Sequence, residues 1–438
     1  MFSTYIKEEA STRRFLLIVS SAVFILSVIV VLVHGDRLLL GDPLKLNNDD
    51  VKYIHSARVL LQEGTLVYNS GDKPSAFIMP GLPILLSGFM AIFGEEHGGV
   101  TAFRIFQSLL QALCIFPVYH IARYTFNHRV AVISTVLVAL YLPDYFTSGS
   151  VLTEGTYRTI ILLLLCAMIT ALHSRKTSWY IVVGLLTAAS AYFKPQASLF
   201  PCMMLFLWLA YRYSFKEIVR FTATILAAYI VLLLPWWIRN VFTFGHFILF
   251  TSSAGSPFLL GTRMNYQLPS AGFFAAYPQY DPKTIFMGSD SDAIAKGLDI
   301  LKYGLVHDPL KYIYHYTIGR FYSLYLVPFY LHDIFSIRKA VVWTIQIVIV
   351  SAGLVGMVWA CIRKNWKPLL PVLLTIAYFT AIHLPFVAMS RYGYPMTFIF
   401  VMFASYAIAQ ALSAFQKAKT NRKEVNKHVE SIGDHPGI

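Results

Sequence analysis

The chain consists mainly of long apolar runs that are separated by short polar connections. Ten runs of 15 to 22 residues match, or nearly match, the ~20 residues that a helix needs to cross a bilayer. The runs cover residues 15–33, 102–123, 129–143, 154–172, 178–193, 197–212, 217–238, 341–362, 368–387 and 395–414. We therefore predict an all-α, polytopic membrane protein with about ten transmembrane helices.

Two further apolar segments are predicted to lie at the interface or to re-enter the membrane. Segment 78–93 offers 14 residues from Pro80 onward, or about 21 Å of helix against a hydrocarbon core of ~30 Å. Segment 311–330 contains Arg320, which alone costs roughly 3 kcal/mol at the centre of a span. Counting such segments, 12 or 13 helices would be associated with the membrane.

The placement of basic residues predicts the orientation. If neither extra segment crosses, 18 Lys and Arg residues fall on one side of the membrane in the short connections and tails, and two, Lys194 and Arg391, fall on the other. Because basic residues collect on the cytoplasmic side, both termini are expected in the cytoplasm. The first run, 15–33, is too long for the core of a signal peptide, so we predict an uncleaved crossing in the cell membrane.

This topology leaves two long loops, 34–101 and 239–340, on the outer face of a single domain over residues 1–416. The polar tail 417–438 is expected to be cytoplasmic and disordered.

Composition supports a bilayer environment and narrows the functional classes. Of 438 residues, 57% are hydrophobic and 13% are charged, whereas soluble domains have about 25% charged residues. This excludes a soluble enzyme, a disordered chain and a fibrous protein. The net charge of +14 has two possible explanations: basic residues that collect in the cytoplasmic loops of a membrane protein, or basic residues that bind an anionic substrate. The sequence has no stripe of basic residues with interleaved aromatics, so nucleic acid is not an expected ligand. It has no nucleotide-binding motif, and its four cysteines are not spaced as metal ligands.

The first long loop contains a candidate catalytic acid. Asp49 and Asp50 follow two asparagines that are good helix N-caps, and the apolar positions that follow predict an amphipathic helix on the membrane surface. Asp49 and Lys52 share the other face of this helix. A capped surface helix without catalytic function is the alternative interpretation.

A second acidic point lies in connection 144–154, which is also predicted on the outer side. Asp144 begins this connection and Glu154 opens the next span. A carboxylate at the mouth of a span is costly, which favours a functional role, although a helix-start carboxylate is again the simpler alternative.

Basic residues on the same side are candidates for a phosphate clamp, for which guanidinium groups are well suited. Arg239 lies at the end of a predicted span, just after Pro235-Trp236-Trp237, and Arg391 is followed by Tyr392. For each arginine, anchoring at the membrane interface within a belt of aromatic residues is therefore as good an interpretation as phosphate binding.

Five short motifs follow one another along the chain: Asp49-Asp50-Val51-Lys52-Tyr53 with Ala57-Arg58, Lys73-Pro74 with Pro80-Gly81-Leu82-Pro83, Leu152-Thr153-Glu154, Pro235-Trp236-Trp237-Ile238-Arg239-Asn240 and Arg391-Tyr392-Gly393-Tyr394-Pro395. Taken together, they resemble the motifs of dolichyl-phosphate-mannose–protein-mannosyltransferase-like enzymes, glycosyltransferase family 39 of the GT-C superfamily, and of the related lipid A aminoarabinose transferase. The likeness covers most of 10–415, and Asp50 replaces the family's usual Glu.

The resemblance implies a GT-C-like fold and an inverting transfer of a sugar, hexosyl or mannosyl in type, from a polyprenyl phosphate to an acceptor hydroxyl. By position in the motifs, Asp49 is expected to be the general base, with Glu154 and Asp50 as further catalytic acids. The remaining predicted site residues are Lys52, Lys73, Arg239 and Arg391 for the donor phosphate, and Tyr53 and Asp144 for the sugar or acceptor.

Several points stay open from the sequence. Metal dependence is not settled: Asp49, Asp50 and Glu154 could hold one divalent cation, but paired carboxylates fit base catalysis without a metal, and no cofactor is certain. The acceptor could be a protein, a lipid or a wall polymer, and the sugar is not specified. A transporter or flippase of a lipid-linked sugar is the alternative function, although no internal repeat of the kind common in transporters is present. A third candidate is a ligase- or polymerase-like enzyme that uses pyrophosphate-linked oligosaccharides.

Overall fold

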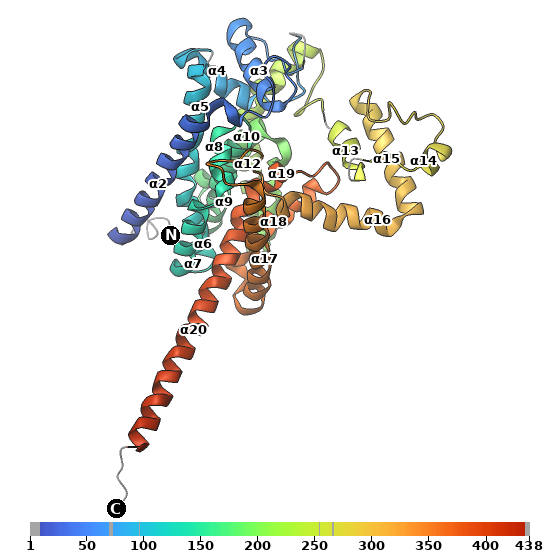
Figure 1. Cartoon of the computed structure of the whole chain (residues 1–438). Coiled ribbons are helices and arrows are strands. Elements are labelled where there is room, and N and C mark those ends of the chain that lie inside the picture. Colours follow the sequence, from blue (N-terminus) through green and yellow to red (C-terminus); the bar gives the residue numbers. More distant parts are fainter. Residues whose placement is uncertain (1–8, 70–72, 96, 254, 265–266, 434–438) are drawn as a thin grey trace, which may run out of the picture.

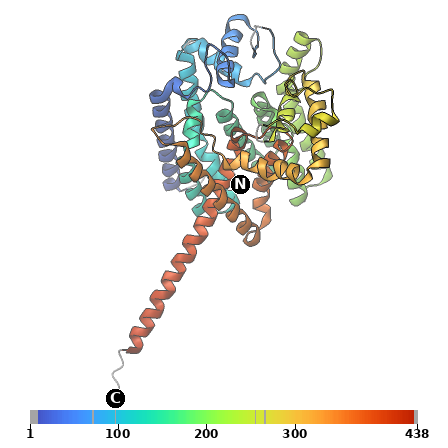
Figure 2. The same ribbon diagram turned by 45° about the vertical axis from the view of Figure 1, so that its right-hand side comes forward.

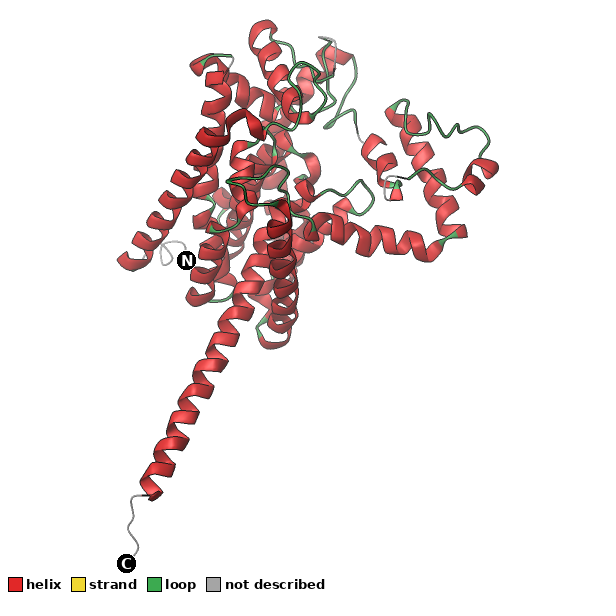
Figure 3. Ribbon diagram, viewed as in Figure 1, coloured by secondary structure: helices red, strands yellow, loops and turns green. Residues whose placement is uncertain are grey.

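The computed structural model describes residues 9–433, apart from 70–72, 96, 254 and 265–266, as a bundle of helices with a smaller helical arm beside it (Figure 1). The described residues form no extended sheet, only one isolated bridge between Ile334 and Ile337 (Figure 3). The bundle comprises α2 (Ala10–His34), α5 (His97–Leu113), α6 (Ile115–Thr125), α7 (His128–Ala139), α8 (Leu142–Gly149), α9 (Glu154–Ser174), α10 (Thr177–Phe193), α11 (Met203–Ala210), α12 (Phe215–Phe244), α17 (Lys339–Arg363), α18 (Trp366–His383) and α20 (Thr397–Gly433). The prediction of an all-α, polytopic membrane protein is confirmed.

Not every predicted crossing is long enough on its own. Among the described residues, six helices are long and apolar enough to cross a membrane, and a seventh results if α7 and α8, bent by 50°, form one broken span. The segments Gly81–Phe93, Thr177–Phe193 and Pro195–Ala210 form shorter apolar helices. A helix occupies each of the ten predicted runs, but the count of ten crossings stays a prediction.

The two segments predicted not to cross adopt different structures. Segment 78–93 contains α4 (Gly81–Phe93), whose 13 residues are too few to span the membrane. Segment 311–330 contains the end of α16 (Pro309–Tyr314) and two short π-helical stretches. In two views α16 runs across the direction of α20 (Figures 1 and 2). This orientation agrees with an interfacial position.

The core of the bundle depends on close contact between α17 and α20. A side chain added at Gly353 or Gly356 would meet the backbone oxygen of Phe400 at 2.7 Å or that of Phe403 at 2.0 Å. Small residues permit such close helix approach inside membranes, where helices associate mainly by packing. This contact fixes α20 and, with it, the segment that leads into α20.

The two ends of the bundle differ. Helices α3 (Asp49–Glu63) and α4 lie at one end, whereas the start of α2 and the end of α20 lie at the other (Figure 1). Beyond residue 416, where the sequence predicts disorder, α20 continues as helix to Gly433. The division of the chain at residue 416 stays a prediction.

Four helices of the long segment 239–340 form the arm. They are α13 (Gly255–Gly261), α14 (Ala271–Ala276), α15 (Asp290–His307) and α16. A small core of its own, made by Leu259, Phe273, Ile285, Ala293 and Ile300, holds α13, α14 and α15 together. The arm meets the bundle beside the segment between α18 and α20, where Val387 N donates to the Pro257 carbonyl at 2.9 Å.

Candidate active site

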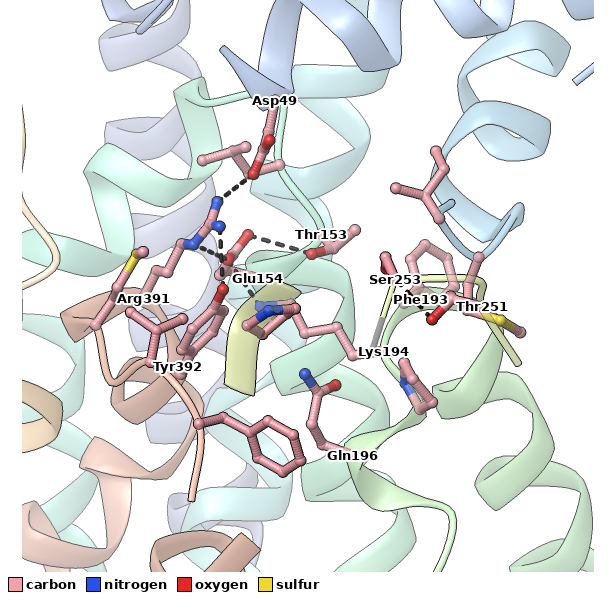
Figure 4. Close-up of a pocket in the computed structure, with 18 of the residues that line it drawn as sticks. Asp49, Thr153, Glu154, Phe193, Lys194, Gln196, Thr251, Ser253, Arg391 and Tyr392 are labelled. Atoms are coloured by element: carbon pink, nitrogen blue, oxygen red, sulfur yellow. Dashed lines mark hydrogen bonds and ion pairs between the residues drawn. The ribbon is translucent and has the colours of Figure 1, made fainter. Parts of the chain in front are cut away.

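A cavity of about 480 Å³ lies where α3, the start of α9, the connection after α10, α13 and the segment before α20 meet. Its polar lining (Figure 4) combines acids, bases, hydroxyls and an amide. These residues are Asp49, Tyr53, Tyr68, Thr153, Glu154, Lys194, Gln196, Thr251, Ser253, Ser256, His383, Arg391 and Tyr392. The structure thus brings together residues from five distant parts of the sequence.

Asp49 is placed by the first turn of α3. The Asn48 side chain accepts a hydrogen bond from Asp49 N at 2.7 Å, so that Asn48 caps the helix as the sequence predicts. The two carboxylate oxygens have different partners. Tyr68 donates its hydroxyl to Oδ1 at 2.7 Å, and Arg391 Nη1 donates to Oδ2 at 2.5 Å. Asp49 is 33% exposed, so its carboxylate remains reachable from the cavity.

Opposing effects determine the pKa of Asp49. Burial, the largest single effect, raises the pKa, because a carboxylate loses solvation when it is buried. The positive charge of Arg391, the hydrogen bonds from Tyr68 and Arg391, and the charge of Lys52 together outweigh burial and hold the pKa below its usual value. Asp49 is therefore ionised at neutral pH and can accept a proton.

Glu154 lies opposite Asp49 and is almost completely buried, with 1% of its side chain exposed. Lys194 Nζ contacts Glu154 Oε1 at 2.8 Å, and Arg391 Nε lies 4.0 Å from the same oxygen. Thr153 donates to Glu154 Oε2 at 3.3 Å. Arg391 therefore connects the two predicted acids, and the four charged side chains form an alternating network (Figure 4).

Lys194 is the main site residue that the sequence analysis does not assign. It follows α10 immediately and lies near the rings of Tyr392 and Tyr157, 4.8 Å and 5.9 Å from their centroids. One signal was present: Lys194 is one of only two basic residues in the short connections on the predicted outer side. The other is Arg391, which contacts the same glutamate.

Asp50 does not belong to the pocket. Its carboxylate is buried and accepts hydrogen bonds from Leu40 N at 2.5 Å and from its own neighbour Val51 N at 2.8 Å. Asp50 thus fastens the segment before α3 to the helix. The three carboxylates predicted as a metal set do not converge, and the described residues contain no group of three or more His, Cys, Asp or Glu side chains suited to a metal ion.

Asp144 also lies outside the pocket lining. It is buried in an ion pair with Arg158, and Tyr394 donates to its Oδ1 at 2.9 Å. This cluster joins α8, α9 and the segment that begins α20. The predicted role of Asp144 in binding sugar or acceptor has no support from its position, whereas Tyr53 does line the pocket.

Three of the four predicted phosphate-binding residues do not line the pocket, and only Arg391 does. Lys52 Nζ lies 5.2 Å from the centroid of the Tyr68 ring, behind Asp49. Arg239 donates to the Ser75 carbonyl at 3.1 Å and packs near aromatic rings. Lys73 is exposed. The geometry of Arg239 agrees with the anchoring alternative.

Lys194→Gln is expected to destabilise the protein by about 1–3 kcal/mol, because the buried Glu154 carboxylate would lose the nearer of its two charged partners and keep only Arg391, at 4.0 Å. Thermal unfolding of the purified protein in detergent measures this change. Lys176→Gln, at the opposite end of α10 and exposed, is the matched control and should unfold like the wild type. An unchanged midpoint for Lys194→Gln would show that the pair contributes nothing to stability.

Comparisons with known proteins concern the family and the fold. Residues 72–238 match the family described as dolichyl-phosphate-mannose-protein mannosyltransferase. Glu154 and Lys194 lie inside the matched segment, and Asp49 and Arg391 lie outside it. No sequence among the curated proteins matches the chain.

The fold is similar to that of solved membrane glycosyltransferases. The apo oligosaccharyltransferase of Archaeoglobus fulgidus superimposes with a TM-score of 0.56 at 14% identity, over 95% of this chain and 53% of that one. The same enzyme, AglB, in complex with an inhibitory peptide and a dolichol-phosphate gives 0.54 at 15% identity, over 95% and 52%. ArnT from Cupriavidus metallidurans gives 0.42 at 15% identity, over 92% and 78%. The chain spans about half the length of the oligosaccharyltransferase.

The resemblance that the sequence motifs predict is thus confirmed: residues 72–238 match the protein mannosyltransferase family, and the chain has the fold of the GT-C membrane glycosyltransferases.

Proposed function

We propose that the protein is an integral-membrane glycosyltransferase that moves a sugar from a polyprenyl-phosphate donor to an acceptor hydroxyl. The observation that carries this proposal is the convergence of Asp49 and Glu154 with Arg391 and Lys194 in one cavity. The match of residues 72–238 to a mannosyltransferase family supports glycosyl transfer. The dolichol-phosphate in the complex of the archaeal oligosaccharyltransferase supports a lipid-linked donor.

Asp49 acts as the general base in this proposal. A neutral hydroxyl is a poor nucleophile, so a positioned base must accept its proton as it attacks. The acceptor oxygen forms a bond to the anomeric carbon while the bond from that carbon to the phosphate oxygen breaks, which inverts the configuration. The proton passes to Asp49, and the electron pair of the broken bond stays on the departing lipid phosphate.

Arg391 and Lys194 supply the positive charge for the leaving group. A phosphate leaves readily when its developing charge is neutralised, so fixed cations serve it better than a proton donor. Glu154 positions both cations, since its Oε1 lies 2.8 Å from Lys194 Nζ and 4.0 Å from Arg391 Nε. Tyr53 and Tyr68 offer aromatic faces to the sugar. This scheme gives no contact with the donor to Lys52, Lys73 or Arg239.

The proposed location of the site is the outer face of the cell membrane. Asp49 and Tyr53 of α3 line the pocket, and α3 lies at the end of the bundle away from the end of α20 (Figure 1). With both ends of the chain in the cytoplasm, as the distribution of basic residues predicts, acceptors outside the cell would reach Asp49 directly.

The direct test is an assay of the purified protein in lipid nanodiscs against a panel of polyprenyl-phosphate monosaccharides. Released lipid phosphate and the new glycoside are both scored, with and without a chelator. A glycosidic product with one donor is the expected result. Counterflow of a radiolabelled lipid-linked sugar without any glycoside would instead favour the transporter alternative and overturn the proposal.

The pH dependence of transfer should report the ionisation of Asp49. Because the pKa of Asp49 is held below its usual value, the base stays ionised as the pH falls, and activity is lost only when the pH drops through that lowered value. In Arg391→Gln the burial effect is less opposed, so the pKa of Asp49 rises and the acidic limb of kcat/KM moves to higher pH. An acidic limb at the same pH in both proteins would contradict this assignment.

A further inference from the structure

Two uncharged polar side chains line the Asp49 pocket and have no role in the chemistry proposed above. Gln196 lies in the short 3-10 turn that follows α10, and His383 is the last residue of α18. Tyr378 of α18 donates its hydroxyl to the Gln196 carbonyl at 2.6 Å. The backbone that carries Gln196 is thus fixed to the helix that carries His383, so both side chains belong to a wall of the pocket that packing holds in place.

The amide oxygen of Gln196 is shielded from solvent and has no hydrogen-bond partner in the described part of the chain. Among the described residues that line the pocket, the only other buried side-chain atom without a partner is Nε of the charged Arg391. Figure 4 shows the Gln196 side chain pointing into the pocket, below Lys194 in that view. Because an unpaired buried acceptor is costly, it indicates a ligand group. Rotation about the last side-chain bond lets the amide offer that group a donor or an acceptor.

His383 offers a second polar atom that the protein does not use. The residue is 6% exposed, and its Nδ1 lies 2.6 Å from the carbonyl oxygen of Phe379. A carbonyl oxygen only accepts, so Nδ1 carries the proton and donates it. Among the described residues, no carboxylate lies within 4.0 Å of the ring nitrogens. A buried charge without a countercharge is costly, so the ring is neutral and its Nε2 is an acceptor for which no described residue supplies a donor.

Both groups lie beside the cations that neutralise the leaving phosphate in the proposed scheme. The His383 ring stacks on Tyr392, with centroids 5.5 Å apart and planes 17° from parallel. Lys194 Nζ lies 4.8 Å from the centroid of the same Tyr392 ring, and Gln196 follows Lys194 by two residues. Because the sugar of the donor is joined directly to the phosphate, that sugar is the part of the substrates that these two side chains border.

We propose that Gln196 and His383 recognise hydroxyl groups of the sugar that is transferred. A sugar hydroxyl both donates and accepts, so it can donate to His383 Nε2 and bind either atom of the Gln196 amide. An ammonium group on the sugar would lack a free countercharge, because the described carboxylates of the pocket, Asp49 and Glu154, are already paired with cations. The two residues therefore favour a hydroxyl over an amine. This extension rests on the proposed function, since it requires a donor sugar in the pocket.

The test measures kcat/KM of the full chain in nanodiscs with undecaprenyl phosphates that carry mannose, glucose or galactose, and with the monodeoxy and monoamino analogues of each. Gln196→Met keeps the length of the side chain but removes its amide. His383→Asn keeps a donor for the Phe379 carbonyl but lacks an atom in the place of Nε2. Gln416→Met, exposed on α20 and outside the pocket lining, is the matched control and should behave as the wild type does.

We expect the wild type to prefer the parent donor over at least one deoxy analogue, and over the matching amino analogue, by about 10-fold or more. Each variant should transfer the parent sugar more slowly and lose that preference. A merely structural role would lower the rates with parent and analogue alike, so an unchanged preference in both variants overturns the inference, whatever their melting temperatures. Equal or faster transfer of every amino analogue by the wild type also overturns it.

The result with the wild type separates this inference from the proposed function. Transfer of a sugar by the wild type together with unchanged preferences in the variants overturns only the role of Gln196 and His383. Absence of transfer from every donor overturns the proposed function itself, and this extension with it. Loss of the preference in one variant alone assigns recognition to that residue and removes the other from the proposal.

Discussion

Asp49→Asn should reduce sugar transfer by about 10²–10⁴-fold, the range that a general base contributes. The asparagine keeps the size of the side chain and can still accept a hydrogen bond from Tyr68 or Arg391, but it cannot take the proton of the acceptor. The measurement is the initial rate of glycoside formation by purified protein in nanodiscs, at equal protein concentration and at saturating donor.

The matched control is Glu63→Gln at the other end of α3, where the side chain is exposed. That variant removes one carboxylate from the same helix and should transfer sugar at the wild-type rate. Comparable expression and thermal midpoints for both variants would show that the loss arises in the chemical step. Full activity of Asp49→Asn would remove the catalytic assignment.

Asp144→Asn should be the most destabilising single change considered for this protein, by about 3–5 kcal/mol. Asp144 and Arg158 are both buried, and removal of one charge leaves the other without a partner in a medium of low polarity. The variant is expected to lower the thermal midpoint in detergent and the yield of folded protein. Both can be read from a melting curve with a size-exclusion profile.

A double variant distinguishes a structural from a substrate-binding role for Asp144. Asp144→Asn combined with Arg158→Met removes both charges and should recover much of the lost stability, because the unpaired guanidinium is gone. If Asp144 bound sugar instead, the single variant would raise the KM for a substrate while the melting temperature stayed near that of the wild type. That result would contradict the position of Asp144 outside the pocket.

The sequence predicts the all-α membrane fold well, because long apolar runs are a local property, whereas the orientation drawn from the basic residues stays a prediction. It also predicts the position of Asp49 at the start of a capped helix, since the two asparagines before it signal an N-terminus. The structure places Glu154 in the same pocket, as expected for two acids in loops on one face.

The sequence could not show how the acids are partnered. Asp50 lies next to Asp49 in sequence, but successive residues of a helix point about 100° apart, and Asp50 faces Leu40 N instead of the pocket. Lys194 and Arg391 reach Glu154 only because α10 and the segment before α20 end at the same level of the bundle. Such convergence depends on tertiary packing, which no local pattern encodes.

The ion pair between Asp49 and Arg391 joins residues that are 342 positions apart. During biogenesis a nascent chain exposes Asp49 long before the ribosome has made Arg391. Until the C-terminal helices are inserted, the early carboxylate lacks the guanidinium that later orients it. Catalytic competence must therefore arise late in membrane insertion, and a chain that terminates prematurely would have the base but not the site.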